Sequence, residues 1–167
     1  MFAFAIWDLQ ERVLFAARDR LGEKPLYYAT TPGRFAFASE LSALTRCEWL
    51  DIAVDRVALA QYLQYGYVPA PRTAYAGARK LPPAHYLLWR DGDVSVRRYW
   101  DPLEQALAPR LALSADEAVE GLEVLLTRAV RQQMIADVPL GAFLSGGVDS
   151  STIVALMARG GGEVKTF

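Results

Sequence analysis

The sequence predicts an α+β fold of antiparallel strands, followed by the beginning of an α/β fold with a parallel sheet. Three observations lead to this prediction. Short strand-like runs follow one another closely over the first hundred residues, the composition changes between Pro102 and Pro109, and the remainder reads helix, strand, glycine-rich turn, helix. Closely spaced strands favour antiparallel pairing, whereas strands that alternate with helices favour a parallel sheet.

The composition is that of a globular protein. The chain has 167 residues, of which 53% are hydrophobic and 22% charged, with a formal net charge of -1. Such a charge provides no broad basic field, so we expect neither nucleic acid nor a membrane as a partner. The single cysteine, Cys47, cannot form an internal disulfide, and no apolar run approaches the roughly 20 residues that span a bilayer. The expected location is the cytoplasm.

The first four strands are expected within residues 2–39. In FAFAIWD both alternating sets of positions are apolar, which predicts a strand buried on both faces. The runs VLFAARD, PLYYAT and RFAFAS follow at short intervals, which predicts an antiparallel meander. We interpret the charged cluster of Arg18, Asp19 and Arg20 at the end of a strand as a structural ion-pair turn.

A helix and a hairpin are expected in the next sixty residues. Asp55 can cap a helix through VALAQYLQY, and Gly66 can end it. The tyrosines of this stretch are interpreted as packing residues rather than as a base-stacking surface, because basic residues are not interleaved with them. After proline-rich loops, HYLLWR and VSVRRYW flank Asp91-Gly92-Asp93, which indicates a hairpin.

The second half begins after a predicted linker over residues 101–113. Ser114 and Glu117 have the spacing of a capping box, and apolar residues then recur with helical spacing to about Ile135. A short strand is expected at residues 142–144, then a helix after the glycines, then the opening of another strand at residues 164–167. We therefore assign residues 1–100 and 114–167 to two different domains.

The stretch FLSGGVDSS, residues 143–151, joins the short strand to the helix. A glycine-rich bend of this kind leaves backbone N–H groups unpaired at the positive end of the helix dipole, and this favours an anion. A carboxylate at Asp149, beside a bound anion, makes sense mainly if a cation such as Mg²⁺ accompanies the phosphate. The Walker A pattern is absent, because no GxxxxGK[ST] occurs. A turn that only packs a helix against a strand is the alternative.

Both halves resemble one enzyme family. SGGVDSS resembles the pyrophosphate-binding loop of ATP pyrophosphatases, and DVPLGAFLSGGVDSSTIVALM resembles the start of the synthetase domain of glutamine-hydrolysing asparagine synthetases. The upstream segments are similar to the C-terminal part of the glutamine amidotransferase domain of that family: RDRLGEKPLYY, FASELSAL, YLQYGYVPAPRT and KLPPAHYLLW. The resemblance implies an incomplete sandwich of the N-terminal-nucleophile type, followed by the start of a parallel-sheet synthetase domain.

The resemblance also implies an activity. Glutamine would be hydrolysed to ammonia, and aspartate would react with ATP and Mg²⁺ to give an acyl-adenylate, which ammonia converts to asparagine with release of AMP. It implies that Asp149 binds Mg²⁺ and that Leu144 lies beside the adenosine. The residues that it assigns to ATP or pyrophosphate are Leu144, Ser145, Gly146, Gly147, Val148, Asp149, Ser150 and Ser151.

The sequence departs from the family pattern at its start. Such amidotransferases use an N-terminal cysteine as nucleophile, and here the first two residues are Met1 and Phe2. Cys47 is interpreted as a structural thiol and His85 as a hydrogen-bonded histidine, so no residue of this chain is assigned to glutamine hydrolysis. We expect the sequence to be an internal fragment of a longer enzyme and to be inactive alone.

Three alternatives stay open at this point. The enzyme could act on another carboxylate, as β-lactam synthetases and peptide-cyclising relatives do. It could be a stand-alone ATP pyrophosphatase, although the first hundred residues argue against this. It could be a non-catalytic module related to amidotransferases. The expected small-molecule partners are glutamine, aspartate and ATP, and a homodimer is possible; the acceptor carboxylate is not determined by these residues.

Overall fold

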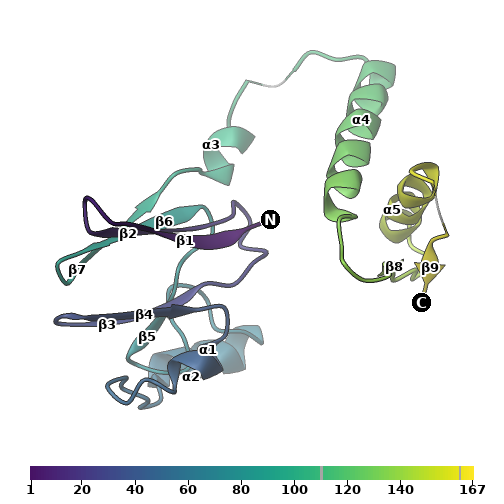
Figure 1. Cartoon of the computed structure of the whole chain (residues 1–167). Helices are drawn as coiled ribbons and strands as arrows, with labels where there is room; N and C mark the ends of the chain where they lie inside the picture. The colour runs from purple at the N-terminus through teal and green to yellow at the C-terminus, as the bar shows by residue number, and fades with distance from the viewer. Residues whose placement is uncertain (110, 162) are drawn as a thin grey trace. The chain divides into compact units, whose positions relative to one another are not determined.

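The computed structural model describes residues 1–109, 111–161 and 163–167. They form two compact units, Met1–Ala108 and Pro109–Phe167 (Figure 1). The boundary between the units lies inside the predicted linker of residues 101–113. The division into domains at residues 1–100 and 114–167 remains a prediction.

The first unit contains two antiparallel sheets, which lie one above the other in Figure 1. One sheet has the order β1-β2-β6-β7 and consists of β1 (Ala3–Asp8), β2 (Val13–Arg18), β6 (His85–Arg90) and β7 (Asp93–Arg98). The other has the order β4-β3-β5 and consists of β4 (Arg34–Ala38), β3 (Tyr27–Thr31) and β5 (Ala78–Lys80). The predicted antiparallel α+β class is confirmed for this unit.

The predicted four-stranded meander is wrong. Two hairpins exist, β1-β2 and β3-β4, but they belong to different sheets, because the connection from Asp19 to Leu26 carries the chain from one sheet to the other. The hairpin around Asp91-Gly92-Asp93 is confirmed, since β6 pairs with β7 from His85 opposite Arg98 to Arg90 opposite Asp93. Local spacing revealed the hairpins, whereas the choice of sheet depends on contacts that are distant in sequence.

Apolar side chains from both sheets form the core of the first unit. Ala16 and Leu87 from one sheet pack with Leu26, Tyr28 and Leu81 from the other part of the unit. The sheets therefore bury their facing sides, as expected for a sandwich.

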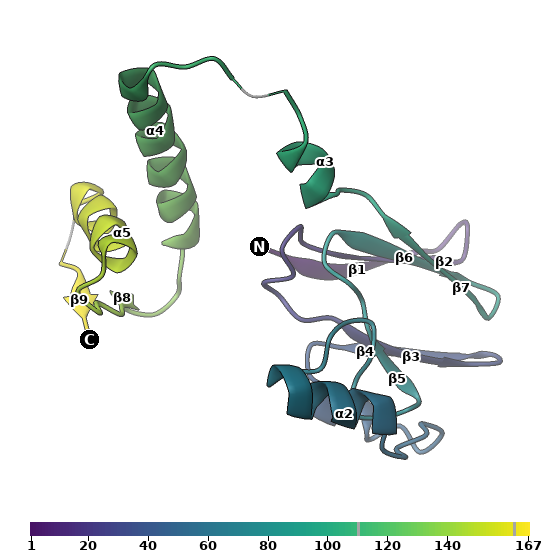
Figure 2. The ribbon, with the colours of Figure 1, turned by 180° about the vertical axis from the view of Figure 1, so that it is seen from behind.

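Helices α1 (Leu41–Leu44) and α2 (Arg56–Tyr65) lie on the far side of the β4-β3-β5 sheet, as both ribbon views show (Figures 1 and 2). The predicted cap of α2 is confirmed, because the Asp55 carboxylate accepts the backbone N–H groups of Val57 and Ala58. Gly66 ends the helix in the left-handed conformation with φ 77°.

The turn after β2 is organised by two charged side chains. The Asp19 carboxylate is 4% exposed and accepts backbone N–H groups from Phe2, Leu21, Glu23 and Lys24. Burial raises the pKa of this carboxyl, but the four hydrogen bonds lower it by more, to about 2. The side chain of Arg18 donates to the carbonyl oxygens of Lys24, Leu81 and Gly22, with a donor–acceptor distance of 2.7 Å in each case.

This turn is therefore structural, as expected, but it is not an ion-pair turn. Both charges satisfy backbone groups instead of each other, because a sharp connection between two sheets leaves many N–H and C=O groups without strand partners. Arg20 takes a different role and lies over the ring of Trp100, at 5.5 Å from its centre.

The expectation that β1 is buried on both faces is also wrong. β1 forms one edge of its sheet, and Phe4, Ile6 and Trp7 are all exposed. Alternation of apolar residues showed that the segment is a strand, but it could not show how many layers cover that strand.

The second unit contains two packed helices and a short parallel strand pair. They are α4 (Ala115–Gln133), β8 (Gly141–Ala142), α5 (Val148–Arg159) and β9 (Lys165–Thr166); α3 (Pro102–Ala106) precedes them in the first unit. The capping box of Ser114 and Glu117 is confirmed. The strand predicted at residues 142–144 is found as β8 at Gly141–Ala142, where it pairs with Lys165–Thr166.

The pairing of β8 with β9 is parallel, as the helix between them requires. In the part of the chain that the structure describes, no helix is both long enough and apolar enough to cross a membrane.

Candidate functional site: the turn between β8 and α5

The predicted site residues form a single turn in the second unit. Gly146 has φ 80°, a left-handed conformation that glycine adopts without strain, and Gly147 is the N-cap of α5. A methyl group at Gly146 would find nothing within 4 Å. The bend therefore depends on backbone freedom rather than on close packing, which argues against the interpretation that the glycines only allow a tight helix–strand contact.

The first turn of α5 has no side-chain cap. Gly147 lacks a side chain, and no side-chain hydrogen bond satisfies the N–H groups of the first turn. The residues from Ser145 to Asp149 are exposed, and Ser150 is half-buried. Uncapped donors at the positive end of a helix can hold an anion.

Two serine hydroxyls meet across the turn. The Oγ atoms of Ser145 and Ser150 are 3.1 Å apart, and the Ser150 hydroxyl also donates to the carbonyl oxygen of Gly147 over 3.2 Å. Ser151 lies one residue further into α5 and is exposed. The structure thus brings Ser145 and Ser150 together, while Ser151 makes no contact with either that would orient its hydroxyl.

Leu144 and Val148 flank the glycines on opposite sides. The backbone N–H of Leu144 donates to the carbonyl of Phe167 over 2.9 Å, so this residue is tied to the strand pair. Val148 opens α5 and is strongly exposed. The role of Leu144 beside a nucleotide remains a prediction.

Asp149 is exposed in the first turn of α5 and accepts no hydrogen bond in the described structure. Within residues 1–109, 111–161 and 163–167 no three His, Cys, Asp or Glu side chains cluster around a possible metal. A closed metal cage therefore does not fit. Mg²⁺ that accompanies phosphates, however, is usually held by one or two carboxylates with the phosphate oxygens, and the single free carboxylate of Asp149 fits that arrangement.

Packing between α4 and α5 holds the turn in place. Val130, Leu156 and Met157 are buried together, and Leu126 and Val164 pack against them. An ion pair between Arg159 and Glu123 joins the same two helices. The turn therefore joins elements whose positions are set by the hydrophobic core of the second unit.

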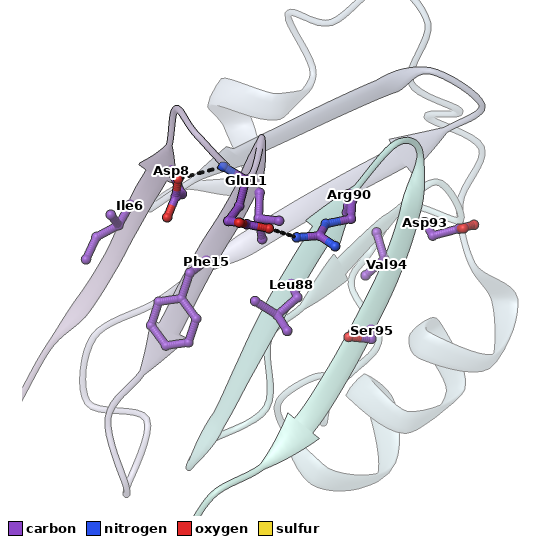
Figure 3. Close-up of a pocket in the computed structure, with 10 residues that line it drawn as sticks. Ile6, Asp8, Glu11, Phe15, Leu88, Arg90, Asp93, Val94 and Ser95 are labelled. Atoms are coloured by element: carbon purple, nitrogen blue, oxygen red, sulfur yellow. Dashed lines mark hydrogen bonds and ion pairs between the residues drawn. The ribbon is translucent and has the colours of Figure 1, made fainter.

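The first unit carries a pocket of about 700 Å³ on the outer face of the β1-β2-β6-β7 sheet (Figure 3). Its wall is apolar at Ile6, Phe15 and Leu88, and its rim carries an ion pair of Arg90 with Glu11 at 2.9 Å. The residues that line it include no histidine or cysteine. We assign no chemistry to this pocket.

The two residues considered as alternative catalytic groups have ordinary structural surroundings. Cys47 is half-buried and packs against the cluster of Ala29, Leu44, Leu50 and Ala78. His85 begins β6, and its Nδ1 lies 2.7 Å from the carbonyl oxygen of Pro83.

Sequence reasoning missed the extent of the Asp19 network. The available signal was an aspartate followed three residues later by Gly22, which adopts φ 70° so that the chain can wrap around the carboxylate. A second missed residue is Lys80, whose ammonium group donates to the carbonyl of Val68, and burial lowers its pKa.

Comparison with known proteins matches two different families to the first and second parts of the chain. A family described as the glutamine amidotransferase domain matches residues 1–100, and one described as asparagine synthase matches residues 121–167.

Similar proteins cover both halves. Asparagine synthetase [glutamine-hydrolyzing] 1 of Bacillus subtilis is 38% identical over 100% of this chain and 26% of its own length. A putative asparagine synthetase [glutamine-hydrolyzing] of Mycobacterium tuberculosis is 39% identical over 100% of this chain and 26% of its own. Amidase chyE of Penicillium rubens is 32% identical over 94% of this chain and 23% of its own. The chain thus spans about a quarter of the length of these relatives.

Proposed function

Because this chain belongs to the family of glutamine-hydrolysing asparagine synthetases, we propose that it is part of an ATP-dependent ligase that uses glutamine to form an amide. The observation that carries the proposal is the succession of two unlike domains in one chain. The first unit matches an amidotransferase family, whose domain would supply ammonia in the whole enzyme. The second unit matches a synthetase family, whose domain would activate the acceptor.

In the second unit, we assign the turn between β8 and α5 to the pyrophosphate of ATP. The exposed N–H groups after Gly146 and Gly147 donate to phosphate oxygens, and the hydroxyls of Ser145, Ser150 and Ser151 add donors. Fixed donors of this kind stabilise the negative charge that develops when pyrophosphate leaves. Asp149 would hold Mg²⁺, whose charge offsets that of the phosphates.

The acceptor is aspartate in this proposal, activated as aspartyl-adenylate with pyrophosphate as the leaving group and then converted to asparagine and AMP by ammonia. The first unit would contribute part of an N-terminal-nucleophile-type sandwich, supported by its two stacked antiparallel sheets. The protein would act in the cytoplasm.

A different carboxylate acceptor is the second candidate. It is favoured by relatives named as amidases rather than synthetases, which are 32% identical to the chain. Both candidates require the same adenylation turn, so they differ only in what is activated.

The test is ATP–pyrophosphate isotope exchange in the full-length protein with Asp149→Ala. Exchange in the presence of aspartate reports adenylate formation directly, and we expect at least a hundredfold loss, because the carboxylate that holds the metal is gone. Glutamine hydrolysis should be nearly unchanged, since it belongs to the other domain.

Asp116→Ala is a matched control, because Asp116 is also an exposed acid in the first turn of a helix, α4. It should leave exchange unchanged. Normal exchange in Asp149→Ala would overturn the assignment of the turn. Exchange with another carboxylic acid but not with aspartate would support the second candidate.

A further inference from the structure

Gly141 is the first residue of β8 and lies shortly before the turn that starts at Ser145. Its backbone is not in the left-handed region, so its conformation is open to other residues. The space around it is not open, because a methyl group here would lie 2.7 Å from Cε2 of Phe167 and 3.2 Å from the carbonyl oxygen of Lys165. Gly146 shows the opposite combination, a φ of 80° and nothing within 4 Å of an added methyl group. Gly141 is therefore required for space, and Gly146 for conformation.

The strand pair cannot easily move to make room for a side chain at Gly141. Successive side chains of a strand point to opposite faces, so Gly141 and Ala142 face opposite ways. Ala142 and Val164 both pack against the buried cluster between α4 and α5, which holds the two strand segments from that side. Lys165 is the register partner of Gly141. An added methyl group would thus turn the ring of Phe167 and push the backbone of Lys165 away from β8.

Phe167 also holds the start of the turn through its backbone. β8 and β9 lie side by side in both ribbon views (Figures 1 and 2). The N–H of Phe167 donates to the carbonyl oxygen of Ala142 over 3.1 Å, and the carbonyl oxygen of Phe167 accepts the N–H of Leu144 over 2.9 Å. Leu144 directly precedes Ser145. Two hydrogen bonds therefore transmit a displacement of Phe167 to the first residue of the turn.

The turn is sensitive to a small displacement of Ser145. Its Oγ lies 3.1 Å from that of Ser150, which is at the upper end of the range for a hydrogen bond between hydroxyls. A phosphate held by several donors needs all of them at hydrogen-bonding distance at once, so a shift on one side of the turn weakens binding.

We infer that Gly141 and the ring of Phe167 position the turn between β8 and α5 for the pyrophosphate of ATP. The ring lies where a side chain at residue 141 would otherwise be, and the backbone of Phe167 fixes where Ser145 starts. Both are positioning residues, because they act through the turn and not on the nucleotide. The inference rests on the proposed function, since it concerns the anion assigned to that turn.

The test is ATP–pyrophosphate exchange in the full-length protein with Gly141→Ala, measured against the concentration of ATP and, separately, of aspartate. We expect the KM for ATP to rise about tenfold and the KM for aspartate to stay nearly unchanged, because only the turn is displaced. Phe167→Ala alone should raise the KM for ATP by no more than about threefold. The double variant should lie below Gly141→Ala, because removal of the ring makes room for the methyl group.

Gly121→Ala is the matched control, because Gly121 lies in α4 and an added methyl group there meets nothing within 4 Å. Its KM for ATP should equal that of the original protein. A Gly141→Ala enzyme with a lower kcat and an unchanged KM for ATP has only lost folded protein, and this result would overturn the inference. A double variant that binds ATP more weakly than Gly141→Ala would overturn it too.

Asp149→Ala, measured in parallel, separates this inference from the proposed function. If Asp149→Ala abolishes exchange while Gly141→Ala behaves like Gly121→Ala, the positioning role is wrong and the proposed function stands. Normal exchange in Asp149→Ala would overturn both.

Discussion

Two turns of this molecule each combine an aspartate with glycine. They differ in whether the carboxylate accepts the backbone N–H groups of its own turn. Asp19 and Asp149 both follow a strand and lie next to glycine-containing bends, Asp19 before Gly22 and Asp149 after Gly147. The carboxylate of Asp19 is buried and accepts four backbone N–H groups of its own turn. That of Asp149 is exposed, and the N–H groups around it have no side-chain partner.

The difference separates a structural turn from the turn that we propose to bind pyrophosphate. A bend whose donors are satisfied by a carboxylate of the chain has no capacity left for an external anion. A bend whose donors remain exposed retains that capacity. On this proposal, substitution of Asp19 should affect stability, whereas substitution of Asp149 should affect binding.

The largest effect is expected for Asp19→Ala. The substitution leaves four N–H groups without their acceptor, two of them with bonds of 2.9 Å, and a buried unsatisfied donor costs about 1–3 kcal/mol. Because the turn can relax and admit water, we expect a total loss of about 3 kcal/mol. All four tryptophans lie in the first unit, so denaturant unfolding followed by tryptophan fluorescence measures that unit.

Asp55→Ala is the control for this experiment. Asp55 also accepts two backbone N–H groups, but at the N-cap of a short helix, where the loss is expected to be smaller than at Asp19. Equal losses of unfolding free energy in the two variants would mean that the Asp19 network stabilises the unit no more than an ordinary helix cap does.

A smaller effect is expected in acid. The folded pKa of Asp19 is about 2, below its ordinary value of 3.8, so its contribution is fully present above pH 4 and disappears as the pH falls towards 2. Linkage between proton binding and folding converts this difference into about 2 kcal/mol. We expect the stability of the first unit to fall through this range, and the fall to be smaller in Asp19→Asn.

The pKa values of two other carboxyls are also lowered in the folded chain. Hydrogen bonds from the backbone of Ala58 and from Arg72 lower the pKa of Asp55, and the bonds with Ser114 lower that of Glu117. The difference between the original chain and Asp19→Asn therefore isolates the contribution of Asp19. Parallel pH profiles of the two proteins would contradict the assigned role.

Local sequence signals predicted most of the elements but not their assembly. The Asp55 cap, the Ser114–Glu117 capping box and the Asp91-Gly92 hairpin are correct because each depends on residues within a few positions. The meander and the burial of β1 are wrong because sheet membership depends on distant contacts, such as Ala16 against Leu87 and Tyr28 against Leu81.

At the candidate site, too, local features could be predicted from the sequence and features that depend on three-dimensional geometry could not. The bend at Gly146 and the helix that starts at Val148 could be read from SGGVDSS, because turn chemistry is local. The contact between the hydroxyls of Ser145 and Ser150 could not, since it depends on the geometry of the bend. The network around Asp19 was missed because Phe2 lies 17 residues away along the chain.

The smallest effect on stability is expected for Asp149→Asn. This side chain accepts no hydrogen bond in the described structure, so its neutralisation removes only a weak interaction with the dipole of α5. We expect the free energy of unfolding to change by less than about 0.5 kcal/mol. Circular dichroism of the helices is the measurement, because the second unit contains no tryptophan.

The amide is nearly the same size as the carboxylate, so the shape of the turn is kept while the charge that would hold Mg²⁺ is lost. Adenylate formation in the full-length protein should then fail in an enzyme that is as stable as the original. A loss of more than 1 kcal/mol would instead place Asp149 with Asp19, as a residue that shapes its turn rather than one that binds there.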